Sequence, residues 1–215
     1  MPTVHTFGDS ILDCAHYNPH RVDPGLLLVR NVDPLFPEFR GRDLASRGPA
    51  HLAHHAVDGS TVADLPAQAR GLRVEGPSVA LLTIGGNDLL MGLLSDPGPG
   101  IDDFAIDLDA FLNALPIRPV LIGTVYDPTF GDDALNVFGI DPARGRANHR
   151  RLNGVLDGLA GRYGHLVDLH AHFLTGGPDW YVRTIEPSAL GASEVRRCFL
   201  EAIEALGHLN RGSSA

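Results

Sequence analysis

The stretch VHTFGDS, residues 4–10, decides the fold, because an apolar run ends there in a glycine and two polar residues. The run at 4–7 predicts a short buried strand, and Gly8 allows a tight turn directly after it. In open α/β sheets, functional sites form at the carboxyl ends of the strands. We therefore expect Ser10 to be exposed at this edge of a sheet. The tripeptide alone is a weak signal, since Asp and Ser are also common in turns and helix caps.

Further short apolar runs alternate with helical patterns along the chain. This rhythm predicts a parallel sheet with helices on both faces, which is a three-layer α/β/α fold. The last helix is the clearest, since Val195, Phe199 and Leu206 recur at helical spacing. Ser60 is a candidate cap for an earlier helix. The expected strands are 4–7, 55–57, 79–84, 119–125 and 166–169, and the expected helices lie near Ala50 and at 61–72, 102–115, 141–163 and 188–206.

The composition narrows the class of protein. The chain has 215 residues, a formal net charge of −9 and no lysine. This length fits one domain, which we assign to 1–210, with a loose tail at 211–215. A net negative surface repels phosphate backbones, so nucleic acid is not an expected partner. No signal segment precedes the first strand and no apolar run reaches the length of a membrane span, so we expect a cytoplasmic protein. The sequence leaves the oligomeric state open.

Two further strand ends carry polar motifs. GGND, residues 85–88, follows the third expected strand, and VDGST, residues 57–61, follows the second. The Asn87 side chain supplies an N–H that can stabilise an oxyanion, and Gly59 offers a backbone N–H. Each motif alone is also typical of a strand-to-helix turn. Asp9, Asp88 and Asp127 are expected at the same edge and are candidate substrate contacts.

Together, the GDS at 8–10, Gly59 and the GGND at 85–88 resemble, in order and spacing, the motifs of the GDSL/SGNH hydrolase family. The resemblance extends to 185–191 and so covers nearly the whole chain. It implies a five-stranded parallel sheet in a flavodoxin-like arrangement, and hydrolysis of small-molecule esters without a metal or other cofactor. It also implies that Ser10 is the nucleophile. The N–H groups of Ser10 and Gly59 and the side chain of Asn87 would then form the oxyanion hole.

The C-terminal block departs from this family. Arg183 stands at the family's Asp position and Glu186 at its His position, so the spacing is kept while both charges are reversed. We interpret the two as a compensated pair, in which an Arg orients a Glu. An unperturbed glutamate has a pKa of about 4.3 and an unperturbed histidine one of about 6.5, so Glu186 is the weaker base at neutral pH. A purely structural ion pair is the alternative.

Two histidines offer another base. Asp168, His170 and His172 follow the fifth expected strand. On a strand-like stretch His170 and His172 would point the same way, and Asp168 would orient one of them. His170 or His172 is therefore a second hypothesis for the base, beside Glu186. The simpler interpretation is a pair of edge or packing histidines.

Three functions remain open from the sequence. The first is a serine ester hydrolase with an unusual base. The second is a catalytically impaired relative that binds an acylated or glycosidic ligand in the same pocket. The third is a metal-assisted phosphoesterase, although no compact metal-ligand spacing supports it. Its candidate donors are Asp9, Asp13, Asp88, Glu186, His170 and His172.

Overall fold

Five parallel strands form the central sheet, in the order β2-β1-β3-β4-β5. This is the strand order of flavodoxin-like folds, which confirms the expected fold class. The computed structural model describes residues 1–135 and 139–207, so the tail expected at 211–215 lies outside the described residues. The strands are β1 (Thr3–Gly8), β2 (His51–His54), β3 (Ser78–Thr83), β4 (Val120–Gly123) and β5 (Gly164–Val167).

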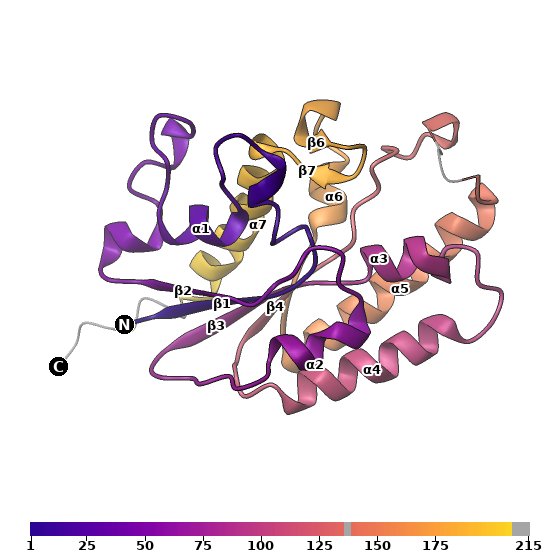
Figure 1. Ribbon diagram of the computed structural model, residues 1–215, viewed down its shortest axis with the longest axis horizontal. Coiled ribbons are helices and arrows are strands. Elements are labelled where there is room, and N and C mark those ends of the chain that lie inside the picture. Colours follow the sequence, from indigo (N-terminus) through magenta and orange to yellow (C-terminus); the bar gives the residue numbers. More distant parts are fainter. Residues whose placement is uncertain (136–138, 208–215) are drawn as a thin grey trace.

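Helices cover both faces of the sheet. Figure 1 shows α1 and α7 on one face, and α2, α4 and α5 on the other. Side chains alternate along β3, so Leu81 packs with Phe199 on the first face while Leu82 packs with Leu108 on the second. The helices are α1 (Pro24–Val29), α2 (Leu65–Gln68), α3 (Gly86–Asp88), α4 (Gly100–Ala114), α5 (Pro142–Tyr163), α6 (Leu169–Phe173) and α7 (Ala189–Leu206). Shorter 3₁₀ helices lie at Ala15–Tyr17, Pro37–Phe39, Leu44–Arg47, Val62–Asp64, Asp133–Leu135 and Pro178–Trp180, and a π-helical turn lies at Leu89–Leu93.

The last helix, α7, forms as its sequence predicts. Ser188 caps it, because its hydroxyl accepts a hydrogen bond from the N–H of Gly191 at 3.1 Å. Val195, Phe199 and Ile203 are buried on one stripe of the helix and join the core beside α1. Among the described residues, no helix combines the length and the apolar character needed to cross a membrane.

Three elements before β3 differ from the prediction. The second strand is His51–His54 rather than 55–57, and the helix expected near Ala50 is a 3₁₀ helix at Leu44–Arg47. The strand HLAH contains no apolar run and pairs only with β1, so its pattern does not reveal it. The helix expected at 61–72 is two short pieces, capped by Thr61 and not by Ser60. Pro66 lacks an N–H, which prevents one continuous helix.

A small antiparallel hairpin precedes α7. It consists of β6 (Tyr181–Val182) and β7 (Glu186–Pro187), with Val182 paired to Glu186. Arg183 and Thr184 form its turn with left-handed backbone angles, φ 49° and 77°. Figure 1 shows the hairpin next to α6 and one end of α7. The hairpin thus places the altered C-terminal block outside the sheet.

Candidate active site

Ser10 directly follows β1, at the carboxyl edge of the sheet. Gly8 sets its path, since its φ is +119° and a Cβ there would collide with the backbone oxygen of Thr83. The N–H of Asp9 donates to that same oxygen at 3.1 Å. The Gln68 side chain bonds both the N–H and the carbonyl of Gly8 at 2.8 Å. This tight turn leaves Ser10 in the wall of a cavity, with 9% of its surface exposed.

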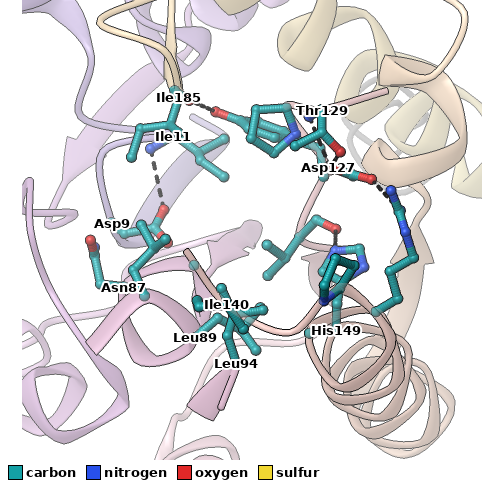
Figure 2. Close-up of a pocket in the computed structure, with 18 of the residues that line it drawn as sticks. Asp9, Ile11, Asn87, Leu89, Leu94, Asp127, Thr129, Ile140, His149 and Ile185 are labelled. Carbon is teal, nitrogen blue, oxygen red and sulfur yellow. Dashed lines mark hydrogen bonds and ion pairs between the residues drawn. The ribbon is translucent and has the colours of Figure 1, made fainter. Parts of the chain in front are cut away.

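The cavity beside Ser10, called the Ser10 cavity below, has a volume of about 150 Å³. In Figure 2, Asp9 and Asn87 lie on one side of it, and Asp127 and His149 lie on the opposite side. Between these polar groups the lining is mainly apolar. The apolar lining includes Ile11, Leu89, Leu90, Leu94, Val125, Ile140 and Ile185.

Glu186 is a half-buried carboxyl group whose pKa responds to the Ser10 hydroxyl. Burial raises the pKa of Glu186, and the Ser10 hydroxyl opposes this rise because it stabilises the ionised form. The nearby carboxylate of Asp58 raises the pKa of Glu186 further, whereas His16 and Arg183 lower it. Within the described chain, Glu186 Oε2 is buried and has no hydrogen-bond partner. A carboxyl group with a raised pKa and a spare acceptor oxygen therefore lies next to the candidate nucleophile.

The predicted ion pair between Arg183 and Glu186 is wrong: within the described chain, no ion pair joins them. The Arg183 guanidinium carbon lies 5.0 Å from the centre of the Tyr17 ring instead. The physical reason is the hairpin turn, in which Arg183 and Thr184 both take left-handed backbone angles. Arg183 acts on Glu186 only electrostatically, by lowering the pKa of its carboxyl group.

Asn87 and the loop that holds Gly59 meet at the same edge. Asn87 lies in α3, shortly after β3, and lines the Ser10 cavity. Its side-chain amide donates to the carbonyl of Ser60 at 2.9 Å, which leaves the second amide hydrogen for another acceptor. Gly59 has a φ of +78°, and its α-carbon faces open space, since no heavy atom lies within 4 Å of the point where a Cβ would stand. The structure thus brings the Gly59–Ser60 loop to Asn87, and Asn87 to the cavity of Ser10.

Asp9 fixes the turn that presents Ser10. Its Oδ1 accepts hydrogen bonds from the Ile11 N–H at 3.2 Å and the Thr83 hydroxyl at 2.8 Å. Burial raises the pKa of Asp9 to about 7, while these two hydrogen bonds oppose the rise. Asp9 lines the cavity, as a substrate contact requires, but one of its oxygens already serves the turn.

The sequence pattern of the GDSL-like Lipase/Acylhydrolase family matches residues 6–193. The chain belongs to this family. The match includes Ser10, Gly59, Asn87 and Glu186, so the altered block is part of the family domain. No curated protein sequence matches the chain.

Solved structures resemble this chain over nearly its whole length. An α/β hydrolase enzyme from the metagenome of Lake Arreo, Spain, is 21% identical, with a TM-score of 0.65 and 95% of each chain covered. The acetylxylan esterase Axe2 from Geobacillus stearothermophilus is 19% identical, with a TM-score of 0.67, covering 94% of this chain and 93% of its own. An extracellular lipase from Streptomyces rimosus is 18% identical, with a TM-score of 0.62, covering 94% of this chain and 100% of its own. At these identities the likeness establishes the fold.

The two histidines after β5 do not lie on a strand. They belong to α6, which Asp168 caps by accepting the N–H of Ala171 at 3.0 Å. Residues two apart on a helix point about 200° apart, so the expectation that His170 and His172 share a direction is wrong. His172 Nε2 lies 2.9 Å from Glu194 Oε2.

His170 also lies outside the Ser10 cavity. Its ring packs edge-on against His149, with the ring centres 4.8 Å apart. Its Nδ1 is buried and has no hydrogen-bond partner within the described chain. His149, which sequence reasoning missed, lines the Ser10 cavity instead of His170. In the sequence, His149 is one polar residue among many in the helix expected at 141–163.

Asp88 and Asp127 each hold a loop at the carboxyl edge of the sheet. Asp88 accepts the N–H of Val62 at 3.2 and 3.3 Å, and burial raises its pKa. Asp127 lines the cavity, where it accepts hydrogen bonds from Thr129 and from Arg146, whose NH1 lies at 3.0 Å. Although burial alone would raise it, the pKa of Asp127 is lowered by these hydrogen bonds, with the two from Thr129 the strongest. Contact of either carboxylate with substrate stays a prediction.

Sequence reasoning also missed a polar group near Glu186, formed by His16, Tyr17 and Asp58. Asp58 Oδ2 accepts a hydrogen bond from the Tyr17 hydroxyl at 2.6 Å and lies 3.1 Å from His16 Nε2. In the motif at 57–61, the sequence predicted a role in the site only for Gly59. His16 and Tyr17 lie in a stretch without periodicity. Within the described residues, no three His, Cys, Asp or Glu side chains converge as metal ligands.

Proposed function

We propose that the chain is a serine hydrolase of carboxylic esters, with Ser10 as nucleophile and Glu186 as general base. The observation that carries this proposal is the place of Ser10 in the wall of an apolar cavity, with the half-buried carboxyl group of Glu186 among its electrostatic neighbours. A raised pKa brings a carboxylate closer to the range in which it accepts a proton efficiently at neutral pH. The apolar Ser10 cavity supports the proposal, because an ester group can enter it next to Ser10.

The proposed reaction has two steps. Ser10 Oγ forms a bond to the ester carbonyl carbon while Glu186 accepts the hydroxyl proton, and the alcohol then leaves with that proton. Water attacks the acyl-Ser10 carbonyl, again losing a proton to Glu186, and Ser10 recovers its proton as the acid leaves. The N–H groups of Ser10 and Gly59 and the Asn87 amide would stabilise the oxyanion in both steps.

Covalent labelling tests this function. A fluorophosphonate probe should add one group to the intact chain, as measured by protein mass. The Ser10→Ala variant should stay unlabelled, whereas Ser95→Ala, which changes an exposed serine, should label normally. A folded, unlabelled chain that turns over no short-chain p-nitrophenyl ester would overturn the proposal.

A catalytically impaired binder is the second candidate, and the Glu at position 186 favours it because a carboxylate is a weaker base than imidazole. Under this alternative, ligand raises the melting temperature but no turnover occurs. His170 as base is tested by His170→Ala. We expect unchanged turnover, because the His170 ring packs against His149 and not against Ser10.

A further inference from the structure

The apolar walls of the Ser10 cavity come from several separate segments. Leu89, Leu90 and Leu94 come from the helical turns after β3, Ile140 precedes α5, and Ile185 comes from the hairpin. Figure 2 shows Leu89, Leu94 and Ile140 together on one side of the open space, with Ile185 across from them. Apolar surface that surrounds an open space favours an apolar occupant.

The polar groups of the lining that lie opposite Asp9 and Asn87 are already bonded within the protein. Asp127 accepts hydrogen bonds from the N–H and the hydroxyl of Thr129, at 2.9 and 2.6 Å. Arg146 binds Asp127 and Asp133. His149 Nε2 donates to the carbonyl of Val125 at 2.7 Å, since a carbonyl only accepts. A sugar would bring hydroxyls that these bonded groups do not satisfy, and burying an unsatisfied hydroxyl is unfavourable.

A separate group of polar side chains lies near Glu186, outside the lining of the Ser10 cavity. His16, Tyr17 and Asp58 form a hydrogen-bonded group near Glu186, and none of the three lines the Ser10 cavity. The site therefore has an apolar side and a polar side, with Ser10 and Glu186 between them. An ester has the same division when its acyl chain is apolar and its alcohol part is polar.

We propose that the Ser10 cavity binds the acyl chain of the substrate and selects chains of about six carbons. This inference rests on the proposed ester hydrolysis. The volume of the cavity, about 150 Å³, is that of an engineered apolar cavity which binds benzene, a molecule of six carbons. An acetyl group leaves most of this volume unused, and a much longer chain extends beyond it.

Ester series with a fixed leaving group test the chain length. We expect kcat/KM to be at least about tenfold higher for p-nitrophenyl hexanoate than for p-nitrophenyl acetate, because each buried methylene contributes. It should not rise further for the dodecanoate. Lengthening the alcohol from methyl acetate to hexyl acetate should change kcat/KM by less than about threefold. Acetate preferred over hexanoate, or a larger gain from the alcohol series, would overturn the inference.

A matched pair of variants tests the place of binding. Leu90 lines the cavity, while its neighbour Met91 is 71% exposed. Leu90→Trp should lower the hexanoate-to-acetate ratio of kcat/KM at least about tenfold, and Met91→Trp should leave that ratio unchanged. Leu94→Ala, which enlarges the cavity, should move the preferred chain length upward, so the test stands if Leu90→Trp does not fold. An unchanged ratio in Leu90→Trp or an unmoved preference in Leu94→Ala would contradict the assignment.

Binding to the Ser10→Ala variant separates this inference from the proposed function. Methyl hexanoate should raise its melting temperature, and methyl acetate at the same concentration should not. Binding without turnover by the unmodified chain would overturn the hydrolase proposal and keep the cavity assignment. Turnover of acetate without any stabilisation by methyl hexanoate would keep the hydrolase and overturn the cavity assignment.

Discussion

The strand-end edge, made of residues 8–10, 59–61 and 85–88, and the β6–β7 hairpin contribute to the same site in different ways. At the strand-end edge the backbone sets the geometry: Gly8 has no room for a side chain, and the Ser60 carbonyl fixes Asn87. The hairpin is held by two residue pairs and contributes side chains alone. The edge that carries the proposed nucleophile keeps the family motif, whereas the hairpin that carries the proposed base departs from it. This contrast teaches that the residue at position 186 can differ without disturbing the turn that holds Ser10.

The hairpin is nevertheless anchored. The Tyr126 hydroxyl donates to the carbonyl of Ile185 at 2.6 Å, directly before Glu186. The N–H of Ser188 donates to the carbonyl of Trp180 at 2.9 Å, directly after the second strand of the hairpin. Neither bond involves the side chain at position 186. The position of Glu186 is thus fixed by its neighbours, whatever residue stands there.

Removing the proposed nucleophile, Ser10, should have the largest effect on the catalytic rate. Ser10→Ala should lower kcat for a short-chain ester by about 10⁴-fold or more, because no other group forms the acyl intermediate. Steady-state kinetics measure the loss, and circular dichroism checks that the variant folds. Ser95→Ala serves as the control. Residual activity within about tenfold of the parent would mean that the strand-end edge does not supply the nucleophile.

Removing the charge of Glu186 in the hairpin should have the second-largest effect on the catalytic rate. Glu186→Gln keeps the size of the side chain but cannot accept a proton, so kcat should fall by about 10²- to 10⁴-fold. In the parent chain, activity should be lost as the pH falls through the raised pKa of Glu186, because the base becomes protonated. Glu201→Gln, at an exposed position of α7, is the matched control. If Glu186→Gln retained both the rate and the acid limb, another group would be the base.

The oxyanion contact should have a smaller effect. Asn87→Ala removes one donor and should lower kcat by about 10²- to 10³-fold with a smaller change in KM. The exposed Asn113 of α4 provides the control substitution Asn113→Ala. Kinetics for one ester at saturating and low concentrations separate the two parameters. A loss confined to KM would assign Asn87 to ground-state binding instead.

The smallest effect concerns stability. The pKa of Asp9 rises from 3.8 to about 7 in the folded chain. Between these values the folded state binds more protons than the unfolded state, so the free energy of unfolding falls as the pH rises through this window. Asp9→Asn should remove this part of the pH dependence while keeping the acceptor oxygen of the turn. Urea denaturation at pH 5 and pH 8 measures it, with Asp103→Asn as control, and equal pH slopes in parent and Asp9→Asn would refute it.

The sequence predicted the strands, helices and contacts that depend on periodicity and on backbone turns. β1, β3, β4 and the long helices α4, α5 and α7 lie close to their expected ranges, because their apolar residues recur at the period of the element. The meeting of Ser10 and Asn87 at one cavity also follows from the order of parallel strands. Both predictions needed only local pattern and the topology of an open sheet.

Side-chain partners across the site did not follow from local pattern. The range of β2 was not predicted, because its histidines pair through the backbone at the sheet edge. The helix α6 was not predicted, because Asp168 caps a helix where a strand was expected to continue. The stacking of Arg183 on Tyr17 joins residues that are far apart in the sequence and depends on two left-handed angles that the sequence does not announce. Contacts of this kind are decided by tertiary packing.

The missing space at Gly8 has a consequence for any attempt to alter this protein by mutation and selection. With the Thr83 oxygen where a β-carbon would stand, a missense change at codon 8 breaks the contact between two central strands before it can alter chemistry. The turn of the hairpin, whose Arg183 and Thr184 are exposed, lies outside that constraint. Libraries that randomise the hairpin should therefore yield many folded clones, whereas libraries at codon 8 should return only glycine.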